Sequence, residues 1–366
     1  MSREGGSPGQ RTSGRVVASV GRLIDAVRLP SGAEEMTVRA HIEDLTKPPG
    51  SLGRLEDAAC RLACILGDPP PPLEPRTVMV LAGDHGVVVQ GVSAYPAEVT
   101  VQMCRNIAEG GAAVAVFARR AAAEVIIADL GVRTPVGHSG VIDRNVVRGT
   151  ADLSVGPALS AGEVERAILA GAGLVRDFAP EARLVASGEM GIGNTTAATA
   201  VTAALLALPA ARVVGPGTGL DTPGVARKSE VVEAALARLP ADPSPIGVLA
   251  EVGGAELAGL VGVVLEAAGR GIPVVLDGFI STAAALAAVR LAPNAKEYLF
   301  ASHRSSEPGH TLQLAALDLE PLLDLRLRLG EGSGAALAIP LLDAAAAMLR
   351  EMATFSSAGV SGRTGP

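Results

Sequence analysis

Apolar residues follow two different patterns along the chain. From Val16 to Gly67 they recur at helical spacing, broken at residues 47–53 (KPPGSLG), where prolines and glycines predict a loop. The run Pro69–Pro72 then predicts a stiff, extended connector. Beyond it, short β-like runs alternate with helical stretches, which is typical of a parallel sheet with helices on both faces. The predicted strands are residues 77–81, 124–129, 183–187, 273–277 and 297–301.

From residue 311 onward the pattern is helical again, apart from a break at residues 330–334 (GEGSG). We expect these last helices to pack with the first ones as a small second domain. The predicted segments are a disordered leader at 1–15, an N-terminal helical segment of the small domain at 16–72, an α/β domain at 73–310, C-terminal helices with the GEGSG turn at 311–361, and a frayed tail at 362–366.

Polar and glycine-rich segments follow the predicted strands. In open parallel sheets, ligands bind outside the carboxyl ends of the strands, where loops meet helix N-termini. We therefore expect a ligand site at this edge of the sheet. The segments are AGDHG at 82–86, LGVRT at 130–134, GEMGIGNTT at 188–196, GFIST at 278–282 and SHRSSEPGH at 302–310.

The segment GEMGIGNTT precedes an alanine-rich helical stretch. Its glycine spacing does not match a dinucleotide fingerprint, and it has no lysine before Thr195 as a P-loop would. Glycine backbone, helix N-terminal amides and the hydroxyls of Thr195 and Thr196 could still hold a phosphate. A tight turn with Thr195 as the helix cap is the alternative. Glu189 would repel a phosphate, so we expect it to face another part of the ligand.

Lysine is rare, with only Lys47, Lys228 and Lys296 in the chain, so each is a candidate for a specific task. Lys228 could supply the charge that a phosphate needs. The alternative is that two of the three lysines are simply solvated.

Other polar residues have equally open interpretations. Asp84 could cap the following segment or contact a substrate, and no other histidine or carboxylate near Asp84 and His85 has metal-ligand spacing. His303 and His310 have no nucleophile partner in the sequence, which favours a hydrogen-bonded structural role. Glu331 could cap the alanine-rich helix that follows it, or its flanking glycines could admit a ligand.

Composition excludes several classes of function. The 366 residues are 48% apolar and 19% charged, as in an ordinary folded protein. A net charge of −7, no Trp, two Tyr and five Phe argue against a nucleic-acid surface. Apolar runs such as 197–208 are too short for membrane spans and no signal peptide is visible, so we expect a cytoplasmic protein. Cys60, Cys64 and Cys104 are expected to be buried thiols.

Eight motifs, taken in order, resemble the nicotinate-nucleotide:dimethylbenzimidazole phosphoribosyltransferases of cobalamin synthesis over roughly residues 16–360. Any one of them would be weak, but eight in order are specific. They are LTKPPGSLGRLE (45–56), AGDHGV with GVSAYPAEVT (82–100), GEMGIGNTT (188–196), GPGTGLD (215–221), EVGGAE (251–256), LDGF (276–279), SHRS with GH (302–310) and RLGEGSGAALA (328–338).

The resemblance implies that the ribosyl phosphate of nicotinate mononucleotide is moved to 5,6-dimethylbenzimidazole with inversion at C1′, giving α-ribazole 5′-phosphate. It implies a homodimer with a Rossmann-like sheet and a small helical domain, without cofactor or metal. Glu331 would be the general base. The implied nucleotide contacts are Glu189, Gly191, Ile192, Gly193, Asn194, Thr195, Thr196, Gly217, Lys228, Asp277 and Ser305, and the implied base contacts are Tyr95, Pro96, Met103 and Leu329.

Two rival functions remain at this point. A nicotinate-nucleotide hydrolase would share the phosphate loop but use water as the nucleophile, and would form product without an added benzimidazole. A non-catalytic nucleotide-binding protein would leave Glu331 without a task.

Overall fold

The computed structural model describes residues 19–361, so the predicted leader (1–15) and tail (362–366) lie outside the described residues. The strands are β1 (Arg76–Gly83), β2 (Ala123–Gly131), β3 (Val141–Asp143), β4 (Leu184–Met190), β5 (Val274–Leu276) and β6 (Leu299–Ala301). The helices are α1 (Val20–Ala26), α2 (Glu35–Asp44), α3 (Arg54–Leu66), α4 (Val99–Ala108), α5 (Ala113–Arg120), α6 (Ala161–Phe178), α7 (Asn194–Leu206), α8 (Ala210–Val213), α9 (Thr222–Leu236), α10 (Pro245–Val252), α11 (Ala255–Gly269), α12 (Phe279–Leu291), α13 (Pro308–Leu317), α14 (Ser333–Glu351) and α15 (Phe355–Ala358), with 3₁₀ turns η1 (Gly86–Gln90) and η2 (Pro293–Tyr298).

All strand pairs in the six-stranded sheet are parallel, in the order β3-β2-β1-β4-β5-β6. This is the Rossmann order, which reverses direction between β1 and β4. The five predicted strands are confirmed, with two differences. Residues 297–298 belong to η2 rather than to β6, and β3 was not predicted because a three-residue strand is too short to show a period.

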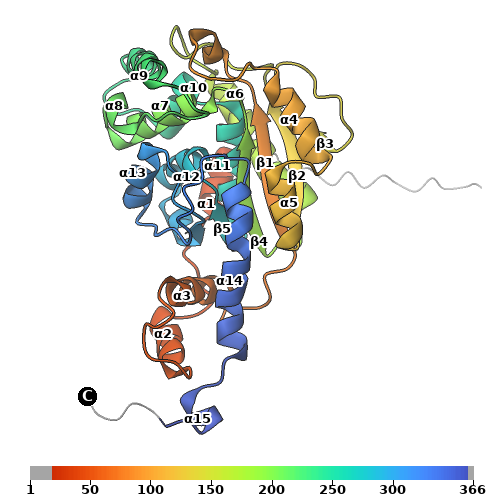
Figure 1. Cartoon of the computed structure of the whole chain (residues 1–366), viewed down its shortest axis with the longest axis vertical. Helices are drawn as coiled ribbons and strands as arrows, with labels where there is room; N and C mark the ends of the chain where they lie inside the picture. Colours follow the sequence, from red (N-terminus) through yellow and green to blue (C-terminus); the bar gives the residue numbers. More distant parts are fainter. Residues whose placement is uncertain (1–18, 362–366) are drawn as a thin grey trace, which may run out of the picture.

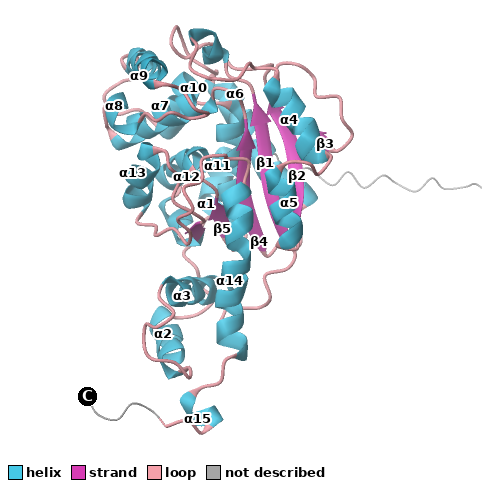
Figure 2. Ribbon diagram, viewed as in Figure 1, coloured by secondary structure: helices cyan, strands magenta, loops and turns pink. Residues whose placement is uncertain are grey.

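Helices cover both faces of the sheet, as the alternating pattern predicted (Figures 1 and 2). α6, α11 and α12 pack on one face, and α4, α5 and α14 pack on the other. Every residue of β1 is buried, because both of its faces lie against helices. α6 and α11 approach so closely that a Cβ on Gly171 would collide with the Gly259 carbonyl. Glycine is therefore required where these two helices cross.

A helical extension projects beyond the sheet (Figure 1). It holds α2, α3 and the far end of α14, and a β-bridge joins Leu45 to Thr354 near its tip. The predicted loop at residues 47–53 lies within the connection between α2 and α3, residues 45–53. α13 instead packs on α12 in the α/β part of the molecule. The division of the chain into two domains at the predicted boundaries stays a proposal.

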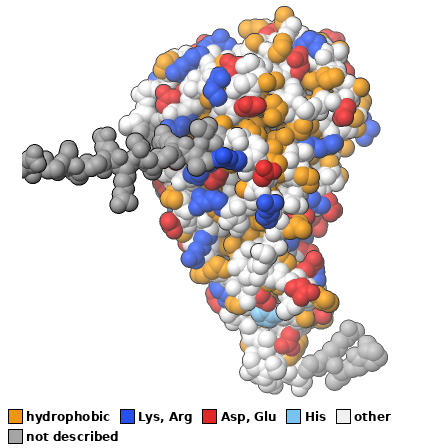
Figure 3. Space-filling view, turned by 180° about the vertical axis from the view of Figure 1, so that it is seen from behind, with side chains coloured by type: hydrophobic (Ala, Val, Ile, Leu, Met, Phe, Trp, Pro, Cys, Tyr) orange, Lys and Arg blue, Asp and Glu red, His pale blue; other side chains and the backbone are white. Residues whose placement is uncertain are grey.

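α14 is long and apolar enough to cross a membrane by length and composition, but 61% of its apolar window is buried inside the molecule. The same is expected of a core helix in a soluble protein. Acidic and basic side chains are interspersed on the face seen in Figure 3. Cys60 and Cys104 are buried and Cys64 is half-buried, all three as free thiols, and burial raises the pKa of Cys60 and Cys104 to about 12.

Candidate active site

A cavity of about 330 Å³ opens at the carboxyl ends of β4, β5 and β6. Its wall combines segments that lie far apart in the sequence. The residues that line it are Tyr95, Val99, Met103, Glu189, Met190, Gly191, Ile192, Asn194, Thr195, Gly217, Thr218, Asp277, Gly278, Phe279, Ile280, His303, Ser305, Glu307, Arg328, Leu329, Gly330 and Glu331.

Four helices begin at this cavity: α7, α12, α13 and α14. The first residues of α7 and α12, the N-cap residue of α13 and the turn before α14 all line the wall. Helix N-termini carry partial positive charge and unpaired N–H groups. The peptide N–H of Thr195, for instance, has no hydrogen-bond partner among residues 19–361. The cavity is thus suited to an anion such as a phosphate.

Glu189 lies fully buried at the end of the cavity next to the GEGSG turn. Its Oε1 accepts the peptide N–H of Glu331 at 3.4 Å, and its Oε2 accepts a hydrogen bond from the Asn194 side chain. Burial, together with the nearby Asp277 charge, raises the pKa of Glu189 to about 8. A carboxyl group with this pKa is mostly neutral at pH 7. An acid can therefore stand in a loop suited to an anion without repelling the anion.

Asp277 fixes the start of α14. Its Oδ1 accepts the peptide N–H groups of Gly334 and Ala335 at 2.8 and 3.0 Å, and its Oδ2 accepts that of Gly332 at 3.2 Å. These bonds satisfy the free N–H groups of the helix N-terminus. The acid that caps α14 is thus Asp277, and the capping interpretation of Glu331 is wrong.

Glu331 points into the cavity from a strained turn. Its φ of 65° lies in the left-handed region, as do those of Gly330 and Gly332 at 82° and 87°. Its carboxylate makes no hydrogen bond or ion pair within the described part of the chain, where only its backbone N–H is bonded, to Glu189. Burial, followed by the Asp277 charge, raises the pKa of Glu331 to about 7. A carboxylate with this pKa is well matched to proton abstraction near neutral pH.

Asp277→Asn is expected to shift the acid limb of the kcat profile to lower pH, by about one unit. The reason is that the Asp277 charge holds up the pKa of Glu331, while an asparagine oxygen can still accept N–H groups at the start of α14. Measuring kcat at saturating substrate from pH 5 to pH 9 checks this, with a thermal melt to confirm folding. An unmoved limb would show that Asp277 does not set the charge of Glu331.

Lys228 stands behind the opposite end of the cavity. It is completely buried, and its Nζ donates to Thr195 Oγ1 at 2.9 Å and to the Gly215 carbonyl at 3.4 Å. Burial lowers the pKa of Lys228 to about 8. Lys47 is also buried, in an ion pair of 2.9 Å with Glu56. The alternative that two of the three lysines are solvated is therefore wrong.

Two histidines near the cavity form hydrogen bonds that hold neighbouring segments in place. His310 Nδ1 accepts the Ser305 N–H at 2.9 Å, so its proton sits on Nε2, which meets Thr282 Oγ1 at 3.1 Å. Burial lowers the pKa of His310 to about 3, which keeps the ring neutral. The Ser302 hydroxyl joins the Asp277 carbonyl to His303 Nδ1, both at 3.0 Å. A structural role is confirmed for His310, whereas His303 also lines the cavity.

Most of the sequence-predicted residues meet at this cavity. Those that line it are Glu189, Gly191, Ile192, Asn194, Thr195, Gly217, Asp277, Ser305, Tyr95, Met103, Leu329 and Glu331, and those that do not are Gly193, Thr196, Lys228 and Pro96. Gly193 is the N-cap residue of α7, so Thr195 is not the cap. Thr196 is completely buried.

Two charged residues at the end of the cavity near Lys228 were not predicted from the sequence. Glu307 accepts the Gly217 N–H at 2.9 Å, and Arg328 donates to the Gly217 carbonyl at 3.3 Å. Both stand inside motifs that were recognised, SHRSSEPGH and RLGEGSG, but nothing in their spacing marked them.

Asp84 and His85 of the AGDHG segment lie outside the cavity. Asp84 Oδ2 accepts the Arg133 N–H at 2.9 Å, and His85 Nε2 pairs with Glu256 Oε1 at 2.7 Å in full burial. Neither residue lines the cavity, so the substrate-contact interpretation of Asp84 has no support from its position. Within residues 19–361, no group of three His, Cys, Asp or Glu side chains is arranged to hold a metal ion.

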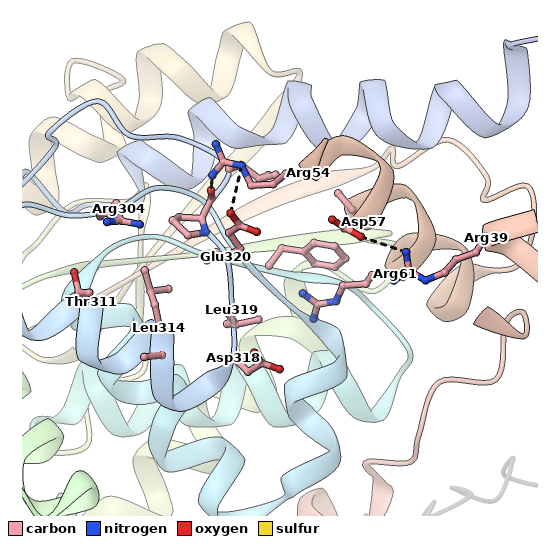
Figure 4. Close-up of a pocket in the computed structure, with 16 residues that line it drawn as sticks. Arg39, Arg54, Asp57, Arg61, Arg304, Thr311, Leu314, Asp318, Leu319 and Glu320 are labelled. Atoms are coloured by element: carbon pink, nitrogen blue, oxygen red, sulfur yellow. Dashed lines mark hydrogen bonds and ion pairs between the residues drawn. The ribbon is translucent and has the colours of Figure 1, made fainter. Parts of the chain in front are cut away.

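A larger hollow of about 640 Å³ lies between α3 and α13 (Figure 4). Its arginines are mostly engaged within the protein. Arg54 donates to the Pro321 carbonyl and faces Glu320, Arg39 pairs with Asp57, and Arg61 donates to the Leu299 carbonyl and stacks over Phe300. The contacts of Arg54 and Arg61 join the helical extension to the rest of the molecule, and the Arg39–Asp57 pair joins α2 to α3 within the extension.

Comparisons with known proteins agree on one family. A sequence profile described as phosphoribosyltransferase matches residues 27–360. The chain is 53% identical over 325 residues to the nicotinate-nucleotide–dimethylbenzimidazole phosphoribosyltransferase of Thermus thermophilus, covering 88% of this chain and 97% of that protein. The corresponding enzyme of Chloroflexus aurantiacus is 52% identical over 320 residues, covering 87% and 91%.

Solved structures give the same result. A crystal structure of the Thermus thermophilus enzyme superposes with a TM-score of 0.86 at 51% identity, covering 90% of this chain and 98% of that one. A crystal structure of CobT from the same organism superposes with a TM-score of 0.87 at 52% identity, covering 89% and 98%.

Proposed function

We propose a reaction for this chain, which belongs to the nicotinate-nucleotide–dimethylbenzimidazole phosphoribosyltransferase family. The chain moves the 5-phosphoribosyl group of nicotinate mononucleotide to 5,6-dimethylbenzimidazole or a related base. The products are α-ribazole 5′-phosphate, nicotinate and a proton. The observation that carries the proposal is the Glu331 carboxylate, which faces the cavity without a partner in the described chain and has its pKa raised to about 7.

The chemistry needs one proton acceptor. The bond from C1′ to the pyridinium nitrogen breaks, and the electron pair neutralises the leaving nicotinate ring, so this step needs no acid. The attacking benzimidazole nitrogen forms the new bond to C1′ and gains positive charge. Glu331 removes the proton from the other ring nitrogen and relieves that charge.

The two ends of the cavity suit the two parts of the substrate. Thr195, Ser305 and the helix N-termini offer hydrogen-bond donors for the phosphate, with the Lys228 ammonium directly behind Thr195. Tyr95, Met103 and Leu329 offer apolar surface for the incoming base, next to Glu331. Glu189, mostly neutral at pH 7, can donate a hydrogen bond near the ribose or the leaving base. Asp277 contributes by holding the turn that carries Glu331.

Base exchange is tested by incubating the protein with nicotinate mononucleotide and a panel of bases, without added metal, and identifying products by mass. We expect α-ribazole 5′-phosphate and free nicotinate, formed only when a benzimidazole or a related base is present. Nicotinate released at the same rate without any base would instead show a hydrolase.

Assembly and location follow from the same proposal. Tyr95 and Leu329 line the cavity yet are 52% and 56% exposed, so its base end is open in a single chain. A homodimer in the cytoplasm is the proposed working form, with a second copy covering this end. Light scattering should give twice the chain mass of 36.7 kDa; a mass of one chain would contradict it.

A further inference from the structure

Residues 215–217 are held between two buried charges. The Gly217 N–H donates to Glu307 Oε1 at 2.9 Å from one side, and Lys228 Nζ donates to the Gly215 carbonyl at 3.4 Å from the other. A Cβ on Gly215 would collide with Glu307 Oε2, and a Cβ on Gly217 would lie 3.3 Å from Lys228 Nζ. Positions 215 and 217 of this turn therefore leave little room for a side chain, and the turn separates a carboxylate from an ammonium.

Glu307 is an unexpected residue at the end of the cavity that is suited to a phosphate. It is 4% exposed, and its Oε2 is buried without a hydrogen-bond partner among residues 19–361. A buried, half-satisfied carboxylate is unfavourable unless another interaction compensates for it. A carboxylate here would also repel a bound phosphate. A carboxylate at this position therefore needs a favourable interaction that outweighs both its burial and its repulsion of a phosphate.

We propose that Glu307 is a positioning residue: its carboxylate holds the Gly217 peptide and, across the 215–217 turn, keeps the buried Lys228 protonated, so that a sugar phosphate meets a preformed cation. The identity of the sugar phosphate rests on the proposed function. Glu307 thus affects binding of the sugar phosphate indirectly, through Lys228 and Gly217.

Among the charged residues around Lys228, Glu307 is the one that stabilises the protonated ammonium. Burial lowers the pKa of Lys228 to about 8, and the Glu307 charge opposes that shift. α7 carries no charged residue, Arg212 on α8 is exposed, and Glu251 on α10 is paired with Arg238 at 2.5 Å. The remaining charged residues have other partners or face solvent. Arg328 donates to the Gly217 carbonyl. On α9 itself, Glu233 accepts the Ala210 N–H, Arg227 donates to the Gly91 carbonyl and Glu230 is exposed.

Removing the Glu307 charge should therefore let Lys228 lose its proton at lower pH. Glu307→Gln keeps an oxygen to accept the Gly217 N–H and nearly the same volume. At pH 7 we expect ribose 5-phosphate to bind only about twofold more weakly than to the wild type, because about half of Lys228 is still protonated. The midpoint of the alkaline loss of affinity should fall by about one pH unit, which makes binding about tenfold weaker near pH 8.5.

Calorimetry with ribose 5-phosphate, repeated with nicotinate mononucleotide, from pH 7 to pH 9.5 measures this; the phosphate stays a dianion over that range, since its second pKa is about 6. Ribose 5-phosphate has no leaving base, so its binding tests Glu307 separately from base exchange. Because the chain has three lysines, ¹³C-lysine NMR can follow the Lys228 titration directly, with Lys228→Met to assign its signal.

An unchanged midpoint in Glu307→Gln would overturn the proposal. So would affinity lost equally at every pH, which is a purely structural effect, or affinity gained at every pH, which is simple repulsion. Glu307→Asp keeps the charge and should retain the wild-type midpoint even if the Gly217 contact weakens. A lowered midpoint in that variant would contradict the proposal, whether or not Glu307→Gln folds.

Discussion

Glu331→Gln is expected to lower kcat by about 10²- to 10⁴-fold, the usual contribution of a general base, while the KM for the nucleotide changes little. The amide has the size of the carboxyl group but cannot take a proton from the incoming benzimidazole. The turn should keep its shape, since Asp277 and Glu189 bind backbone N–H groups at 331–335 rather than the Glu331 side chain. Initial rates at saturating benzimidazole check this prediction.

Glu320→Gln is the matched control. It makes the same change at a carboxylate that lines the other hollow and whose side chain is 73% exposed, and it should leave kcat unaltered. Equal rates for wild type and Glu331→Gln would remove the general base from the account. A large rise in nucleotide KM would instead assign Glu331 to binding.

Lys228→Met should raise the KM for nicotinate mononucleotide by about 10- to 100-fold, the effect expected from losing the ammonium that stands behind Thr195 and its charged hydrogen bond to that side chain. The methionine fills much of the buried volume, so we expect the fold to survive and kcat to fall far less than in Glu331→Gln. Calorimetric titration of the nucleotide provides the dissociation constant directly.

Lys296→Met is the control for this change. Lys296 pairs with Asp318 at 3.2 Å near the surface and does not line the cavity, so its loss should leave nucleotide affinity intact. An unchanged affinity in Lys228→Met would count against a role of Lys228 in holding the phosphate.

Much of the architecture could be predicted from local patterns. Each of the five predicted strands exists, because runs buried on both faces stand out as short apolar segments between helical stretches. The polar loops that follow β4, β5 and β6 do meet at one cavity, as parallel strands require. In contrast, β3 is too short to show a pattern, and its place at the edge follows from pairing with β2.

The site itself could be predicted only in part, since its contacts join distant residues. Asp277 reaches the N-terminus of α14 across 57 positions, and Glu307 reaches Gly217 across 90. No local spacing encodes such pairs. The protonation state of Glu189 could not be predicted for the same reason: the burial that raises its pKa to about 8 arises only when the chain folds.

The pH dependence of kcat, measured for the wild type and Glu331→Gln at saturating substrates, tests the general-base account most directly. The base must be ionised, so the wild-type rate should fall as the pH drops below about 7, the pKa to which burial raises Glu331. The residual rate of Glu331→Gln should lack this acid limb. The same limb in both proteins would show that another group takes the proton and would contradict the account.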